Sequence, residues 1–323
     1  MRQKDICVST RTNNISDLAN KVKAFVLSSR SQATVKAYRR EWSHFERWCC
    51  DHGLAALPAT AETVAMYIAD CASACSVGTI TRRLTAITKA HLAAGHPTTP
   101  ATTKHFLVGM TLKGIKRVVG TAQHGKVPLL TADIRKLASC CPKRLLGLRD
   151  RALVLVGFSG AFRRSEISAI DVSHIRWCQE GIVLTLPKSK TDQDAAGREV
   201  GIPRGRGAGT CPVRALQEWL SEAGIVGGPV FRRVDRHGNI SAARLYPDSI
   251  SKLLKRAAAR AGMSVDGISG HSLRAGHATQ AARNGISELT IMRQTGHKSR
   301  PMVRRYIRRG QIFAENAAMG LGL

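Results

Sequence analysis

Residues 270–309 read GHSLRAGHATQAARNGISELTIMRQTGHKSRPMVRRYIRR, and this stretch decides how the second half of the chain is interpreted. Gly285 and Gly296 interrupt its helical patterning. Glycine is the residue that most often ends a helix, because it adopts the left-handed conformation without steric cost. The pattern therefore predicts three consecutive short helices, over Ser272–Asn284, Glu288–Thr295 and Arg300–Arg308.

Helix formation and core packing do not explain four polar side chains in this stretch: His271, Arg274, His297 and Tyr306. His271 and Arg274 are three residues apart, so they project from one face near a helix N-terminus, where backbone N–H groups and a guanidinium can bind one anion. Tyr306 is flanked by arginines that favour attack by its phenolate oxygen, although a helical tyrosine taken singly is more often a core residue. We expect no zinc site on His271 and His277, because the stretch has neither an HExxH pattern nor a suitably spaced carboxylate.

Residues 157–167, GFSGAFRRSEI, carry a second candidate for anion binding. An almost continuously apolar helix over Arg149–Phe158 ends at glycines and delivers Arg163 beside a new helix start. A guanidinium at this place can grip a phosphate with paired donors. Glu166 lies on the same helical face and is expected to hold Arg163 in orientation; the alternative is a surface ion pair.

The rest of the chain divides into a helical part and a mixed part. Residues 15–117 repeat apolar side chains at three- and four-residue spacing, as amphipathic helices do. Gly181–Leu186 and Glu199–Ile202 flank a polar, glycine-containing turn and predict a β-hairpin. We therefore expect a mainly α fold with a small β-sheet (α+β): an all-α domain over residues 1–118, a linker over 119–128 and a mixed domain over 129–323.

The charge balance indicates a polyanionic partner. Lys and Arg number 50 against 22 Asp and Glu, and the formal net charge of +28 repels itself unless a polyanion such as nucleic acid neutralises it. The chain has no secretory signal and no apolar stretch near the roughly 18 residues that span a bilayer, so we expect a cytoplasmic protein without a membrane partner. Its 9 cysteines, without paired CxxC motifs, predict neither a disulfide framework nor a zinc ribbon.

Three motifs occur in a fixed order: R-x-x-E at 163–166, H-x-L-R-x-G at 271–276, and G-H at 296–297 followed nine residues later by Tyr306. This ordered combination resembles the tyrosine recombinase (phage integrase) family, and the likeness covers most of the chain. The resemblance implies a site-specific DNA recombinase with an all-α core-binding domain followed by a mixed catalytic domain. Strands would be cleaved and rejoined through a 3′-phosphotyrosine on Tyr306.

The family's pattern also implies a role for each matching residue. Arg163 and Arg274 would hold the non-bridging oxygens of the scissile phosphate. His271 would assist proton transfer at the attacking oxygen, and His297 would hydrogen-bond the phosphate. A lysine on a β-hairpin turn serves as general acid in this family, and Lys190 in the expected turn is the first choice, with Lys188 left open because the hairpin register is not fixed by one sequence.

The resemblance further implies a homotetramer on double-stranded DNA, because strand exchange needs two duplexes and four active sites. The apolar end of the chain, residues 312–323, would serve as an oligomerisation tail that packs into a neighbouring subunit. No GxxxxGK[ST] loop or acidic metal cluster occurs in the sequence, so we expect a reaction without ATP, metal ion or other cofactor. DNA binding would place the protein at the nucleoid.

Two basic faces in the helical domain are candidates for DNA contact. The helix that begins near residue 78 carries Arg82 or Arg83 to read guanine in the major groove and Lys89 to meet phosphate. The second face is formed by Lys36, Arg39 and Arg40. For each of these residues the alternative is an ordinary solvated surface.

Two other functions remain open on the sequence. A type IB topoisomerase uses a similar arrangement to relax supercoils without pairing two sites, although the helical first domain and the apolar tail favour a recombinase. A non-cleaving DNA-binding accessory protein would not depend on Tyr306 for any activity.

Overall fold

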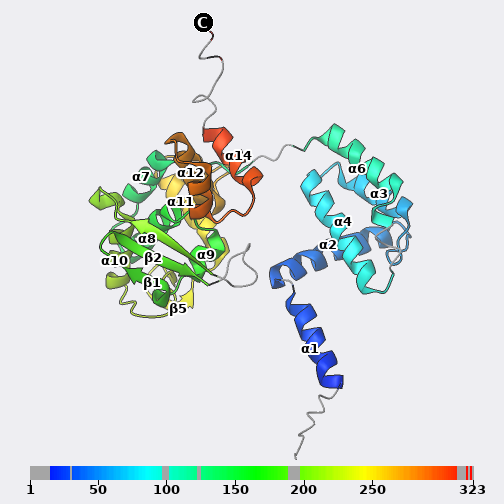
Figure 1. Ribbon diagram of the computed structural model, residues 1–323, viewed down its shortest axis with the longest axis horizontal. Coiled ribbons are helices and arrows are strands. Elements are labelled where there is room, and N and C mark those ends of the chain that lie inside the picture. Colours follow the sequence, from blue (N-terminus) through cyan, green and yellow to red (C-terminus); the bar gives the residue numbers. More distant parts are fainter. Residues whose placement is uncertain are drawn as a thin grey trace, which may run out of the picture. The chain divides into compact units, whose positions relative to one another are not determined.

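The computed structural model describes residues 15–29, 31–96, 102–121, 125–187 and 197–310, together with residues 318 and 321. The chain forms two compact units, Met1–Gln123 and His124–Leu323, each drawn in Figure 1. The boundary between them falls inside the segment 119–128 that the sequence predicts to be a linker. Lys188, Lys190 and nearly all of the tail over 312–323 lie outside the described residues.

The described part of the first unit is helical, as predicted, and its helices are α1 Ile15–Ser28, α2 Gln32–Asp51, α3 Ala61–Cys71, α4 Val77–Ala93 and α6 Phe106–Val119. Ser31, Thr60 and Ser76 cap the N-termini of α2, α3 and α4, because each hydroxyl accepts the backbone N–H three residues later. The caps fix where the helices begin, and buried side chains on α2, α3 and α4, including Phe45, Tyr67 and Ile80, fill the core between them.

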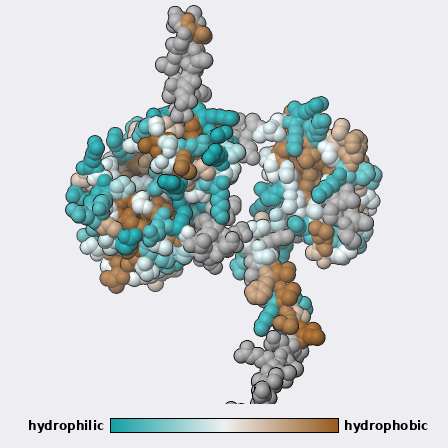
Figure 2. All heavy atoms as spheres, viewed as in Figure 1, coloured by the Kyte–Doolittle hydropathy of each residue, from teal (hydrophilic) through white to brown (hydrophobic). Residues whose placement is uncertain are grey.

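Helix α1 differs from the others because its apolar side chains are exposed. Val22, Phe25 and Val26 are all more than half exposed, and Figure 2 shows brown residues along this helix. Among the described residues, no helix is both long and apolar enough to cross a membrane.

The second unit is mixed, and its helices are α7 Thr131–Ser139, α8 Leu145–Ser159, α9 Arg164–Ala169, α10 Pro212–Glu222, α11 Pro247–Arg260, α12 His271–Arg283, α13 Glu288–Thr295 and α14 Arg300–Gly310. The last three confirm the helices predicted from residues 270–309 to within two residues at each end. Gly285 and Gly296 have φ of 75° and 65°, the left-handed conformation expected of residues that end helices.

Two small antiparallel sheets accompany these helices. Strands β1 (Ile175–Trp177), β2 (Gly181–Leu186) and β3 (Arg198–Pro203) form one sheet in the order β1-β2-β3. The predicted hairpin is confirmed as β2 and β3, whose register pairs Leu186 with Arg198 at the turn end. The sequence did not predict β1 or the second sheet, β4 (Arg232–Val234) with β5 (Ile240–Arg244), because these strands are short and rich in arginine.

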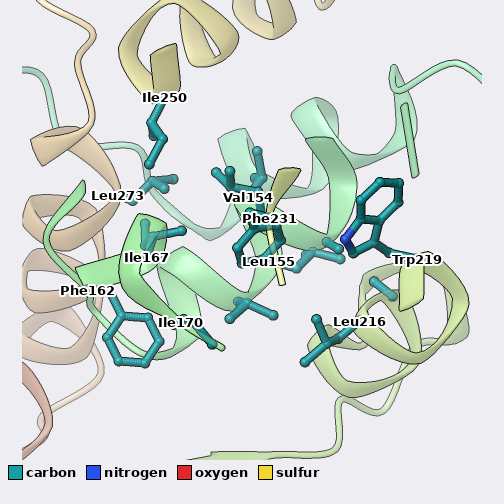
Figure 3. Packing of buried hydrophobic residues seen from close by; sticks show 14 of the residues in the cluster. Val154, Leu155, Phe162, Ile167, Ile170, Leu216, Trp219, Phe231, Ile250 and Leu273 are labelled. Atoms are coloured by element: carbon teal, nitrogen blue, oxygen red, sulfur yellow. The ribbon is translucent and has the colours of Figure 1, made fainter. Parts of the chain in front are cut away.

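Helix α8 is the centre of this unit and is buried along most of its length. Figure 3 shows Val154 and Leu155 of α8 packed near Phe231, with Trp219 of α10 beyond them. The indole Nε1 of Trp219 donates to the Val230 carbonyl at 2.9 Å, so this large side chain is buried without an unpaired donor. The C-terminal end of α8 leads through residues 160–163 into α9 and therefore positions the R-x-x-E motif.

Helix α12 is fixed against the chain that enters the second unit. The N–H of Leu129 donates to the Ser272 carbonyl at 3.1 Å, and a Cβ atom added to Gly276 would lie 1.8 Å from the Leu129 carbonyl oxygen. Only glycine allows this approach of backbone to helix. The contact sets the position of the N-terminal turn of α12, which carries His271 and Arg274.

We predict that Gly276→Ala lowers the free energy of unfolding by at least about 2 kcal/mol, since α12 must move away from Leu129. Gly109→Ala is the matched control: Gly109 is also inside a helix, and a Cβ atom there meets nothing within 4 Å. It should stabilise the chain by about 0.5–1 kcal/mol. Urea unfolding of both variants measures the difference, and equal effects of the two changes would contradict the prediction.

Candidate active site

The tyrosine and the first histidine of the candidate site meet in space although 35 residues separate them in sequence. The hydroxyl of Tyr306 on α14 lies 2.7 Å from Nε2 of His271, the first residue of α12. The buried side chain of Val303 on α14 packs with Ala278 and Ala282 of α12 and with Ile291 of α13. This packing sets the distance between α14 and α12. The geometry allows the imidazole to accept the phenol proton.

Arg274 is 1% exposed and is close enough to His271 and Tyr306 to interact with both electrostatically. Its Nη1 donates to the carbonyl of Ala161 at 2.8 Å, whereas Nη2 is buried and has no hydrogen-bond partner among the described residues. Ala161 is held at φ 51°, an uncommon conformation for a residue with a side chain, and this conformation directs the carbonyl to the guanidinium. A buried donor without a partner is costly, so an anionic ligand at Nη2 would complete the site.

Arg163 is held by Glu166, as the motif predicts. Its Nη1 donates to Glu166 Oε1 at 2.6 Å, and its backbone N–H donates to Oε2 at 2.8 Å. The Glu166 side chain is 2% exposed, which does not fit the alternative of a surface ion pair. One buried carboxylate therefore fixes both the start of α9 and the direction of the guanidinium.

His297 occupies the turn between α13 and α14. It is 7% exposed, its Nδ1 lies 2.7 Å from the Thr295 hydroxyl, and its ring centroid is 5.9 Å from that of Tyr306. Gly296, with φ 65°, makes the reversal that brings the ring back to the site. Because Nδ1 is used by Thr295, Nε2 is the nitrogen through which the ring can meet a ligand.

The site concentrates positive charge. Burial and the neighbouring Arg163 lower the pKa of Arg274 to about 9, and burial together with Arg274 and Arg163 lowers the pKa of His297 to about 3. Desolvation and the guanidinium groups of Arg274 and Arg163 also lower the pKa of His271. Both histidines are therefore neutral at pH 7, so His271 can accept a proton while the arginines bind an anion.

Two further residues support the site and were not singled out from the sequence. Arg198, at the start of β3, donates from Nη1 to the Gln294 carbonyl at 2.8 Å and has Nη2 3.5 Å from Glu166 Oε2. Thr295 orients His297. Neither position carries a motif: Arg198 is an ordinary charged residue at a strand end, and only the fold brings it to Glu166.

Three other residues considered in the sequence analysis, His277, Lys188 and Lys190, are not seen in the described part of the candidate site. His277 is a structural residue, and its Nδ1 lies 2.9 Å from the Phe158 carbonyl. Lys188 and Lys190 fall in the turn between β2 and β3, outside the described residues. Within the described residues, His, Cys, Asp and Glu side chains form no group of three or more that could hold a metal ion.

In the first unit the structure separates the two adjacent arginines of α4. The Arg83 side chain is 11% exposed and lies 3.4 Å from Glu41 and 2.8 Å from the Cys71 sulfur, so the expectation that it reads DNA is corrected. The Arg82 side chain is 43% exposed and lies 3.0 Å from the same carboxylate. Residues Lys36, Arg39 and Arg40 are exposed on α2, and Lys89 is half-buried on α4.

Comparison with known proteins relates the whole chain to one family. The model of the phage integrase family matches residues 129–311. The chain is 40% identical over 310 residues to an integrase/recombinase xerD homolog of Selenomonas ruminantium, covering 96% of this chain and 91% of the relative. It is 25% identical over 325 residues to recombinase cre of Escherichia phage P1, covering 95% of this chain and 90% of that protein.

The same fold is found in a solved structure of a lambda integrase tetramer bound to a Holliday junction. The TM-score is 0.58 at 15% identity, and the alignment covers 93% of this chain and 83% of that chain. At this identity the likeness concerns the fold alone.

We predict that His271 and His297 of the free protein titrate below the ordinary histidine pKa of about 6.5. Because the folded-state values are depressed, the unfolded chain binds more protons below pH 6.5, and these two residues reduce stability as the pH falls through that range. NMR titration of the imidazole nitrogens measures both values, with His297→Asn for assignment. Titration of His297 near 6.5 would contradict the burial argument.

Proposed function

The chain belongs to the phage integrase family, and from that premise we propose that it is a site-specific DNA recombinase that exchanges strands between two sites through a 3′-phosphotyrosine on Tyr306. The observation that carries the proposal is the pairing of a buried, incompletely satisfied guanidinium at Arg274 with a tyrosine hydroxyl 2.7 Å from a neutral histidine nitrogen. The first binds an anion, and the second supplies a nucleophile with a base beside it.

The cleavage step follows from these atoms. The hydroxyl of Tyr306 gives its proton to Nε2 of His271 while Oη bonds to the phosphorus, and the bond from phosphorus to the 5′ oxygen breaks. The guanidinium groups of Arg163 and Arg274 carry the charge that grows on the non-bridging oxygens. The departing 5′ oxygen takes a proton from a lysine of the β2–β3 turn, for which Lys190 and Lys188 are the candidates. Rejoining reverses these steps on a new 5′ hydroxyl.

Two residues act on this step through others, and a third contacts the phosphate directly. Glu166 directs Arg163, and Arg198 ties Glu166 to the end of α13, where His297 begins its turn. His297 would hydrogen-bond a non-bridging oxygen through Nε2. No step assigned to a described residue calls for a nucleotide, because the phosphotyrosine conserves the energy of the broken bond. None calls for a metal ion, because the guanidinium groups of Arg163 and Arg274 carry the charge of the phosphate.

The first unit would bind the same duplex as a core-binding domain. The exposed basic residues of α2, together with Arg82 and the half-buried Lys89 of α4, supply the phosphate and base contacts. Glu41 orients two of them, Arg40 and Arg82, with its oxygen 2.9 and 3.0 Å from their nitrogens. We assign the full reaction to a homotetramer on DNA at the nucleoid, with the tail over 312–323 joining neighbouring subunits. The lambda integrase tetramer on a Holliday junction has this fold and supports that assembly.

We predict that Tyr306→Phe abolishes the covalent protein–DNA adduct while leaving DNA affinity within about threefold of wild type, since the phenol ring keeps its packing. The measurement is denaturing electrophoresis after incubation, without metal or ATP, with nicked suicide duplexes taken from DNA that flanks the gene. Tight binding by wild type without any adduct would favour the non-cleaving DNA-binding protein. Relaxation of supercoiled DNA without joining of two sites would favour the topoisomerase.

The adjacent residues Arg82 and Arg83 offer a matched pair of changes. Arg82→Gln is predicted to weaken DNA binding by about tenfold and to leave the melting temperature unchanged. Arg83→Gln is predicted to lower the free energy of unfolding by about 2–3 kcal/mol, because it removes a buried charged hydrogen bond. Electrophoretic mobility shift and thermal melting on the same two variants measure both effects. Loss of stability in Arg82→Gln together with weakened DNA binding by a stable Arg83→Gln would contradict this prediction.

A further inference from the structure

A hollow of about 330 Å³ lies in the second unit, away from the tyrosine. Its lining comes from the first turns of α8, from the β4–β5 hairpin and from α11. Helix α8 has 15 residues, so its two ends are about 21 Å apart, with this hollow at the N-terminal end and the R-x-x-E motif beyond the C-terminal end. The hollow is therefore a place separate from the site that holds Arg274 and Tyr306.

The lining of the hollow is strongly positive. Five arginines border it against a single acidic residue: Arg144, Arg149, Arg233, Arg236 and Arg256, against Asp235. The carboxylate of Asp235 is already used by the hairpin turn, where it accepts the N–H groups of His237 and Asn239 and the Asn239 amide at 2.8–2.9 Å. Asp235 therefore holds the hairpin in shape, and it forms no ion pair with an arginine within the described residues.

The floor of the hollow is rigid. Arg149 is buried and forms an ion pair with Asp150 at 2.6 Å, and its Nη1 donates to the Arg232 carbonyl at 3.2 Å, which joins α8 to β4. Its charge is compensated within the core. Among the described residues, Arg144, Arg233 and Arg256 form no ion pair, and all three are exposed around this floor. Of these three, only Arg256 is near enough to Asp150 to oppose the rise that burial causes in the pKa of its carboxyl group. Like charges held around one hollow repel each other unless an anion joins them.

We propose that this hollow binds a backbone phosphate of the recombined duplex, outside the cleaved position. The proposal rests on the proposed function, since a bound duplex supplies the phosphate. Arginine forks match phosphate oxygens with paired donors, and Ser249, in the first turn of α11, adds a hydroxyl to the lining. Because α8 alone is about 21 Å long, a phosphate in the hollow would lie several nucleotides away from the scissile phosphate.

The lining favours a backbone phosphate over a free nucleotide. Its apolar residues are the aliphatic Leu146, Val234, Leu245 and Leu253, and the lining contains no aromatic ring on which a base could stack. Recognition is therefore confined to charge, which is sequence-independent and depends on salt. The hollow would fix the register of the duplex on the catalytic unit while leaving its sequence unread.

The test removes the charge on each partner in turn. Full-length wild type and R144Q/R233Q/R256Q are titrated against duplexes that carry the cleavage site and one neutral methylphosphonate at each backbone position. Wild type should lose about tenfold in affinity at one or two positions several base pairs away from cleavage. The triple variant should start about tenfold weaker and lose nothing more at those positions, because the same contact is already absent.

R135Q/R206Q/R214Q, exposed arginines outside the lining, is the control of equal charge; it should retain the position-dependent loss of wild type. An unchanged methylphosphonate map in R144Q/R233Q/R256Q would overturn the proposal. The proposal would also be overturned if inorganic phosphate or ATP shifted the NMR signals of the lining arginines while the methylphosphonate map stayed the same in wild type and R144Q/R233Q/R256Q. The hollow would then bind free phosphates. A second readout separates failure of this proposal from failure of the proposed function. If only this proposal fails, wild type and both triple variants still form the adduct at saturating protein. If the proposed function fails, wild type forms no adduct.

Discussion

The candidate site depends on the burial of a charged guanidinium. Taking Arg274 out of water is unfavourable, and the low pKa of about 9 expresses that cost together with the repulsion from Arg163. The protein offsets part of it through the Ala161 carbonyl and leaves one donor without a partner. Such a group is stabilised most when an anion reaches it, and more so as the anion gains charge. This preference for growing negative charge is what a phosphoryl transfer site requires.

The surrounding structure can be understood as what holds that guanidinium in place. The backbone of Leu129 locks the first turn of α12, the end of α8 supplies the strained Ala161, and the hairpin supplies Arg198 to balance Glu166. Tyr306 lies on α14, which packs on α12 and α13 through a small apolar cluster around Val303. The nucleophile therefore rests on a smaller contact than the anion site does, and its position depends more on the packing of α14.

The distribution of positive charge follows a related rule at a larger scale. Two buried arginines outside the candidate site have a carboxylate beside them: Arg149 pairs with Asp150, and Arg83 with Glu41. Arg274, inside the site, forms no ion pair within the described residues. The exposed arginines around the hollow, Arg144, Arg233 and Arg256, form no ion pair within the described residues. The arginines thus fall into two populations, one that is paired inside the fold and one that is left for a polyanion, and the second contributes to the net charge of +28.

The sequence by itself determined the helices over residues 270–309, the β2–β3 hairpin and the identity of the family, because glycine stops, strand alternation and ordered polar motifs are local features. It also identified Arg163, Glu166, His271, Arg274, His297 and Tyr306, which the structure brings together. Only the tertiary structure decided which neighbouring charges are buried. Arg82 and Arg83 are indistinguishable in a local pattern, yet successive helical residues point about 100° apart, and the packing of α2 on α4 buries one and exposes the other. Arg198 and the hollow at the far end of α8 escaped detection for the same reason: they consist of residues with no local signature that meet only when distant segments pack.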